Sequence, residues 1–114
     1  MLRLPRFQLH VPATVADAAL LLREHRAAEQ DAAKTGTPGI TVMLVAGGTD
    51  LYPNMKRRQF TPSTLIALGK ALPRTIQNGA SLTIGAGATL TAVASDPRVL
   101  TGYRALAESA IAVS

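Results

Sequence analysis

Along the chain, short apolar runs alternate with longer segments in which apolar residues recur at helical spacing. Residues 7–11 are a strand-like run that ends at Pro12. Thr14, with Asp17 three residues later, resembles a capping box in which Asp replaces Glu, and it indicates the start of a helix. That helix is expected to reach about Gln30. Its apolar positions at helical spacing are Val15, Ala18, Ala19 and Leu22.

A second apolar run, residues 40–45, is rich in β-branched side chains and predicts a buried strand. If it pairs in parallel with residues 7–11, the helix between them forms a right-handed crossover. A glycine pair at residues 47–48 ends this strand. The next helix begins either at Asp50 or at Pro53, because proline disfavours helical geometry at the residue before it. Both boundaries place the glycines in a strand-to-helix turn.

Residues 64–68 are a third strand candidate, and the signals change from parallel to antiparallel after it. Beyond it, residues 75–77 and 81–85 flank Asn78 and Gly79. This pattern predicts a hairpin whose tight turn uses the positive backbone angles that Asn-Gly tolerates.

Two helices are predicted after the hairpin, over residues 89–94 and 103–113. With 47% hydrophobic residues, the 114-residue chain can bury a sizeable core. The predicted fold class is α/β plus α+β. We expect a small parallel βαβ unit over residues 1–69, followed by the beginning of an antiparallel α+β subdomain over residues 70–114.

The charge balance favours anionic ligands or partners. Twelve Lys and Arg against seven Asp and Glu give a net charge of +5, which suits phosphorylated ligands, polyanions or an acidic partner subunit. Nucleic acid fits poorly, because only two Phe and two Tyr are present and no basic run is interleaved with them. Cysteine is absent, so neither disulfides nor iron–sulphur ligation can form within this chain. His10 and His25 lie far apart with no carboxylate at ligand spacing, so no metal site is expected.

Neither a membrane span nor an export signal is predicted. No apolar run approaches the ~20 residues that a spanning helix requires. Residues 1–6 lack the apolar block and the cleavage site of a secretory signal. A cytoplasmic location is therefore expected.

The glycine pair at residues 47–48 is the feature best suited to binding chemistry. Without side chains, the backbone can approach a ligand closely and present amide hydrogens to phosphate oxygens. Thr49 adds a hydroxyl donor, the start of a helix adds positive dipole character, and the basic run at residues 56–58 raises the local potential. Asp50 is expected to cap the helix or to accept hydrogen bonds from a ribose or ribityl hydroxyl.

Simpler interpretations of these motifs stay open. The pair at residues 47–48 can be an ordinary turn, and residues 56–58 can be a solvated helix face. Residues 69–71 read Gly-Lys-Ala and lack the Ser or Thr that completes a P-loop. Residues 84–90 begin like a dinucleotide fingerprint, but Leu90 replaces the third glycine, which favours a packing turn.

Two other functions compete with cofactor binding. The chain can be a non-catalytic basic interaction module that docks an acidic partner subunit and whose glycine turn is structural. It can also be a small basic RNA-binding domain, whose affinity would fall with salt. Flavin absorbance of the purified full-length subunit distinguishes cofactor binding from the interaction module, and salt-sensitive binding to mixed oligonucleotides would indicate the RNA-binding domain.

Residues 44–51, followed by Met55 and Lys56, resemble the FAD pyrophosphate loop of the FAD-binding domain of molybdopterin dehydrogenases. The family includes xanthine dehydrogenase, aerobic carbon monoxide dehydrogenase and 4-hydroxybenzoyl-CoA reductase, and residues 47–58 look most like the last of these. Further similarity lies in residues 65–68, 82–90 and 106–110. The cofactor-binding residues implied by the resemblance are Leu44, Val45, Ala46, Gly47, Gly48, Thr49, Asp50 and Leu51.

The resemblance implies an FAD-binding (medium) subunit that passes electrons between FAD and iron–sulphur clusters. Its expected partners are a large molybdopterin-binding subunit and a small iron–sulphur subunit, which carry the other cofactors. The first unit would contribute the first FAD loop, and the second unit would begin the remainder of the site. No catalytic residue is assigned in this chain, and the isolated segment is expected to be inactive. The extra iron–sulphur cluster of the 4-hydroxybenzoyl-CoA reductase flavin subunit would need cysteines, which this sequence lacks.

Overall fold

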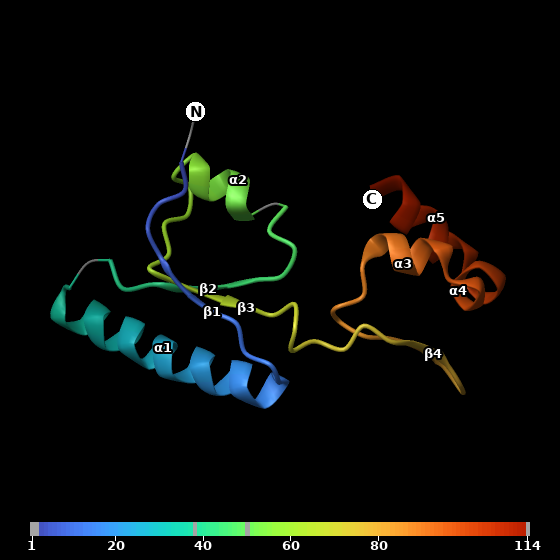
Figure 1. Cartoon of the computed structure of the whole chain (residues 1–114), viewed down its shortest axis with the longest axis horizontal. Coiled ribbons are helices and arrows are strands. Elements are labelled where there is room, and N and C mark those ends of the chain that lie inside the picture. Colours follow the sequence, from blue (N-terminus) through green and yellow to red (C-terminus); the bar gives the residue numbers. More distant parts are fainter. Residues whose placement is uncertain (1–2, 38, 50, 114) are drawn as a thin grey trace. The chain divides into compact units, whose positions relative to one another are not determined.

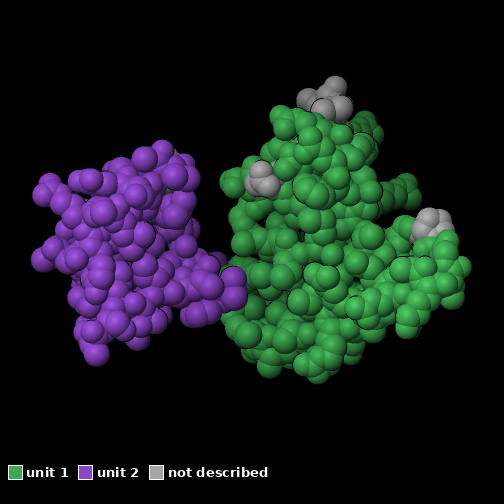
Figure 2. Space-filling view, turned by 180° about the vertical axis from the view of Figure 1, so that it is seen from behind, with its two compact units in different colours: residues 1–71 green, residues 72–114 purple. Residues whose placement is uncertain are grey.

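The computed structural model describes residues 3–37, 39–49 and 51–113. It contains two compact units, residues 1–71 and residues 72–114, which are coloured separately in Figure 2. A parallel sheet with helices forms the first unit and an antiparallel hairpin with helices forms the second, which confirms the predicted fold class. Across the described ranges, no helix is both long enough and apolar enough to cross a bilayer.

The first unit is built on a three-stranded parallel sheet in the order β1-β3-β2 (Figure 1). Its strands are β1 (Gln8–His10), β2 (Val42–Val45) and β3 (Thr64–Ala67). Thr64, Leu65 and Ile66 are all buried, as expected of a strand that is covered on both faces. β1 and β2 therefore do not pair with each other, because each pairs in parallel with the central β3.

Two helices of the first unit lie on opposite sides of this sheet, α1 (Val15–Thr35) and α2 (Leu51–Lys56) (Figure 1). α1 begins as predicted, since Thr14 Oγ1 accepts a hydrogen bond from the Asp17 amide at 3.1 Å. The helix continues past the predicted end near Gln30. It ends only at Gly36, whose φ of +72° closes the last turn in the manner typical of glycine.

A compact core joins the sheet to α2. Met55 of α2 is fully buried and clusters with Val45 of β2 and Leu65 of β3. The partly buried side chains packed against this core are Phe7, Met43, Leu51, Tyr52 and Ala67. The segment between β2 and α2 is thus anchored at both ends in the same core.

α1 also supplies a hydrogen bond to the edge strand β2. The Val42 amide donates to Glu29 Oε2 at 2.9 Å in a partly buried contact. Glu29 thereby fixes the start of the strand that leads into residues 46–49.

Glu29→Ala should lower the free energy of unfolding by about 1–2 kcal/mol, because it removes a charged acceptor from a partly buried amide. Glu29→Gln keeps an acceptor and should cost less. Urea unfolding of the three proteins measures the difference. Equal stability of all three would show that water replaces this bond without loss.

The second unit packs an antiparallel hairpin against a helical layer (Figure 1). Its elements are β4 (Ile76–Asn78), β5 (Leu82–Ile84), α3 (Leu90–Ser95), α4 (Pro97–Gly102) and α5 (Arg104–Val113). Its buried core consists of Ile76, Val93, Ala94, Val99, Ala107 and Ala110. The predicted hairpin and the predicted helices at residues 89–94 and 103–113 are therefore confirmed, with small shifts at their ends.

The hairpin turn differs from the prediction. Asn78 pairs with Leu82 in the ladder, which leaves residues 79–81 as the loop. Neither Asn78 nor Gly79 has a positive φ. The loop is instead closed by the Gly79 amide, which donates to the Ser81 carbonyl at 3.1 Å. A third loop residue relaxes the angles that a two-residue Asn-Gly turn would impose.

The sequence patterns do not predict α4, although its start carries a signal. Asp96 Oδ1 accepts a hydrogen bond from the Arg98 amide at 2.8 Å, and Pro97 occupies the first turn, where its missing amide costs nothing. The Arg98 guanidinium also donates to both Asp96 carboxylate oxygens, at 3.0 and 2.8 Å. The side-chain hydrogen bonds from Arg98 are the main reason that the pKa of Asp96 falls from 3.8 to about 2.

Because the folded-state pKa of Asp96 lies below its ordinary value, its contribution to stability is complete above pH 3.8 and is lost as the pH falls towards about 2. Asp96→Asn keeps a capping oxygen but cannot titrate. The variant should therefore lose less stability than the wild type over this acidic range. Urea midpoints measured across the range test this, and parallel curves for the two proteins would refute the role of the carboxylate.

Candidate cofactor-binding loop

The loop singled out from the sequence lies at the carboxyl edge of the parallel sheet. β2 ends at Val45 and α2 starts at Leu51, so residues 46–49 leave the sheet at this edge. The Leu68 amide, just after β3, donates to the Val45 carbonyl at 2.8 Å and holds the two strand ends together. In open α/β sheets, ligands bind outside the carboxyl ends of the strands.

The predicted cofactor residues differ in their exposure. Val45 is 3% exposed and belongs to the core, so it anchors the loop and cannot touch a ligand with its side chain. Gly48 and Leu51 are half-buried. Asp50, predicted to cap α2 or to bind a ribose or ribityl hydroxyl, lies outside the described residues. The exposed members are Leu44, Ala46, Gly47 and Thr49.

α2 begins at Leu51, between the two predicted starts at Asp50 and Pro53. Pro53 falls in the first turn, where its missing amide is tolerated. The helix has six residues. Its dipole is correspondingly small, so the positive character expected at its start adds little, and the loop must bind an anion through its own donors.

The two glycines of the loop have different surroundings. Among the described residues, no non-neighbouring atom lies within 4 Å of a Cβ atom at Gly47, so they leave this side of the loop open. Gly48 has a φ of +78°, a left-handed conformation that glycine adopts without steric cost. A Cβ atom there would overlap Cδ2 and Cε2 of the Tyr52 ring. The loop thus has an open face at Gly47 and a closed face at Gly48.

The loop keeps its backbone donors unpaired. Among the described residues, the amides of Gly47, Gly48 and Thr49 donate no hydrogen bond to another part of the chain. The Gly48 carbonyl, in contrast, accepts from the Tyr52 amide at 3.1 Å and so closes the turn. Exposed amides of this kind are hydrated and can exchange water for the oxygens of an anionic ligand.

The glycine-rich turn at residues 84–90 is built differently. The Gly85 amide donates to the Thr75 carbonyl and the Gly87 amide to the Pro73 carbonyl, both at 2.8 Å. A Cβ atom at Gly85 would overlap the Pro73 carbonyl, so glycine permits close backbone packing there. The structure agrees with the packing turn expected from the sequence, and these two amides are not available to a ligand.

The basic run after the loop is mainly a solvated surface. Lys56 and Arg57 are exposed. Arg58 has a φ of +61°, and its Nη1 donates to the carbonyls of Arg3 at 2.7 Å and Met55 at 3.1 Å. Arg58 therefore ties the N-terminal segment to α2.

Lys70 is a cation that sequence reasoning did not connect with the loop. It is exposed and follows β3, the neighbour of β2 in the sheet. Because parallel strands end at the same edge, Lys70 belongs to the edge from which the glycine loop departs. Parallel pairing of the two predicted strands at residues 40–45 and 64–68 would have indicated from the sequence that Lys70 lies near the loop.

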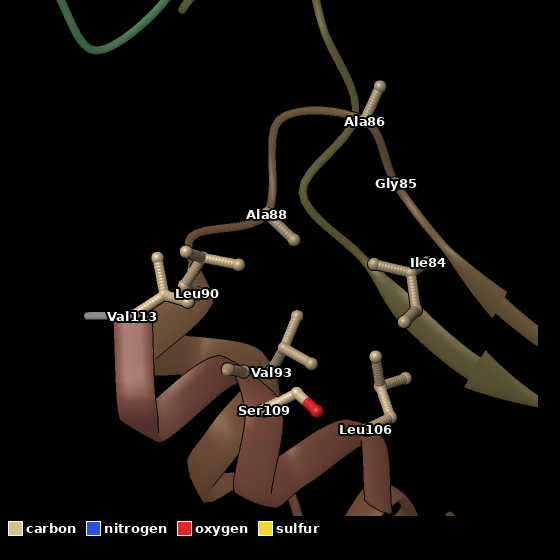
Figure 3. A pocket seen from close by; sticks show the side chains of 10 residues that line it. Ile84, Gly85, Ala86, Ala88, Leu90, Val93, Leu106, Ser109 and Val113 are labelled. Carbon is tan, nitrogen blue, oxygen red and sulfur yellow. The ribbon is translucent and has the colours of Figure 1, made fainter. Parts of the chain in front are cut away.

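A separate apolar pocket of about 460 Å³ lies within the second unit, beside the turn at residues 84–90 (Figure 3). Helices α3 and α5 and strand β5 contribute to its lining. Ser109 is the one polar side chain in that lining, and its hydroxyl donates to the Ala105 carbonyl at 2.8 Å. The pocket lining offers no charged group to an anionic ligand.

The two histidines, far apart in the sequence, lie together in the first unit. The ring centroids of His10 on β1 and His25 on α1 are 5.0 Å apart, with planes tilted by 46°. His10 Nε2 is buried and makes no hydrogen bond within the described chain. No group of three or more potential metal ligands forms in the described ranges, and the pair serves as a contact between the sheet and α1.

Residues 5–114 match the family described as the FAD-binding domain in molybdopterin dehydrogenase. The chain belongs to this family. The glycine loop of residues 46–49 is therefore part of an FAD-binding domain.

Solved structures support the same fold. A chain of the carbon monoxide dehydrogenase from Hydrogenophaga pseudoflava that lacks the Mo-pyranopterin moiety is 33% identical, with a TM-score of 0.75 over 95% of this chain. The reconstituted CO dehydrogenase from Oligotropha carboxidovorans is 26% identical, with a TM-score of 0.78 over 96% of this chain. Quinoline 2-oxidoreductase from Pseudomonas putida 86, at 24% identity and a TM-score of 0.75 over 95% of this chain, shares the fold. This FAD-binding domain spans 34% of the length of each of these chains.

Proposed function

We propose that this chain supplies the diphosphate-binding loop of an FAD-binding electron-transfer subunit in a molybdenum-containing oxidoreductase. The observation that carries the proposal is that the amides of Gly47, Gly48 and Thr49, at the carboxyl edge of a parallel sheet, are unpaired within the part of the chain that the structure describes. Membership of the FAD-binding family gives those donors a matching ligand.

The residues fit the diphosphate of FAD. Gly47 and Thr49 are exposed and Gly48 is half-buried, and no side chain of the described residues lies within 4 Å of a Cβ at Gly47. Gly47, Gly48 and Thr49 would hold the diphosphate, and Val45 and Leu51 would fix the ends of the loop. Bound flavin would supply the redox chemistry, and the protein would position it. Among the loop residues that the structure describes, 44–49 and 51, none has a titratable side chain.

Partner subunits would carry the remaining cofactors. The sequence has no cysteine with which to ligate an iron–sulphur cluster. A large molybdopterin-binding subunit and a small iron–sulphur subunit, as the family resemblance implies, complete the proposed electron path. The net charge of +5 suits docking against acidic surfaces of such partners.

We also propose that the enzyme resembles 4-hydroxybenzoyl-CoA reductase, on the similarity of residues 47–58. The 33% identity to a carbon monoxide dehydrogenase chain favours a different assignment, an enzyme that oxidises CO. The assembled enzyme should reduce 4-hydroxybenzoyl-CoA and leave CO unoxidised. CO oxidation by that assembly would reverse the assignment without affecting the role of the loop.

Gly47→Val tests the loop directly. Its side chain should project into open space, so the fold should survive, while access to the amides is blocked. Loss of one or more charge-assisted hydrogen bonds should weaken FAD binding by about tenfold or more. Flavin absorbance of the assembled enzyme after gel filtration, and its titration with FAD after the flavin is removed, measure the effect.

Gly79→Val is the matched control, because Gly79 also has no atom near a new Cβ but lies in the hairpin of the second unit. It should bind FAD like the wild type. Gly48→Val is a poorer test, since the φ of +78° and the Tyr52 ring would make it disturb folding as well as binding. A folded Gly47→Val protein with unchanged FAD affinity would remove the loop from the site.

A further inference from the structure

The conformation of Gly48 is braced by an aromatic ring from the next helix. Gly48 adopts a left-handed φ of +78°, and the space where an L-residue would carry its Cβ is filled by Cδ2 and Cε2 of Tyr52. The Tyr52 amide donates to the Gly48 carbonyl at 3.1 Å. One residue therefore contacts Gly48 through both its backbone and its side chain.

Tyr52 is itself held in place. It lies in α2, is half-buried, and packs against the core formed by Val45, Met55 and Leu65. Pro53 follows immediately and restricts the backbone of the helix start. The ring cannot leave Gly48 without losing apolar contacts to the core.

We infer that Tyr52 is the positioning residue of the diphosphate loop. Its ring holds Gly48 in the left-handed conformation, closes that face of the loop, and leaves the Gly47 side as the approach for the diphosphate. The inference rests on the proposed function for the identity of the ligand, but the bracing of Gly48 can be measured without any ligand.

The benefit to binding is preorganisation. Ordering the backbone of one residue costs conformational entropy, so amides that are already fixed lose less entropy when a ligand binds. The Tyr52 atoms nearest to a Cβ at Gly48 are the ring carbons Cε2, Cδ2 and Cζ. The ring, and not the hydroxyl, should therefore carry the effect.

Tyr52→Leu and Tyr52→Phe separate the ring from simple apolar bulk. In the wild type and in Tyr52→Phe, the aromatic ring should shift the Hα resonances of Gly48, and the Gly48 amide should show an order parameter near ~0.85. In Tyr52→Leu, the ring-current shift should vanish and the order parameter should fall below about 0.6. FAD affinity should be kept by Tyr52→Phe and weakened about tenfold by Tyr52→Leu.

Phe7→Leu is the matched control, because Phe7 packs against the same core but does not contact Gly48. It should lower the unfolding midpoint to a similar degree while leaving the Gly48 resonances and FAD affinity unchanged. A Tyr52→Leu protein that keeps an ordered Gly48 and wild-type FAD affinity would overturn the inference while leaving the proposed function intact. If the assembled wild-type enzyme bound no FAD at this subunit, and the Tyr52→Leu substitution still lowered the order of Gly48, the proposed function would be overturned and the bracing of Gly48 by Tyr52 would stand.

Discussion

The burial of β3 between two parallel neighbours is the constraint on which the first unit depends. Thr64, Leu65 and Ile66 are shielded on both faces, so this strand can lie only in the centre of the sheet. The register then aligns Val45 at the end of β2 with Ala67 at the end of β3. That alignment brings the glycine loop out at the edge where α/β folds bind ligands.

Local patterns predicted most elements of this fold because each carries its signal in a short window. Thr14 marks the start of α1 through a capping bond that needs only residues three apart. The alternation of β4 and β5 around a turn likewise predicts their pairing. α4 was not predicted, although Asp96 caps its start and Pro97 lies in its first turn.

Features that depend on distant residues could not be predicted in this way. The strand order β1-β3-β2 is one of several orders that are compatible with the same hydrophobic pattern, so the pattern does not select it. The contact between His10 and His25 follows from the packing of α1 on the sheet, and the sequence separation of the two residues conceals it. The place of Lys70 at the loop's edge follows from the strand order, which had to be known first.

The two glycine-rich turns show why composition does not identify a binding loop. Both follow a strand and both contain two glycines, yet Gly85 and Gly87 use their amides to join neighbouring backbone while Gly47 and Gly48 do not. An unpaired amide lowers the stability of the fold little when it is hydrogen-bonded to water. A mobile loop with free amides would nevertheless bind its ligand weakly, because the conformational entropy lost on ordering the loop offsets the free energy gained from each new hydrogen bond. A loop suited to an anion therefore needs exposed donors together with an independent brace, and the Tyr52 ring against Gly48 meets the second condition without occupying any donor.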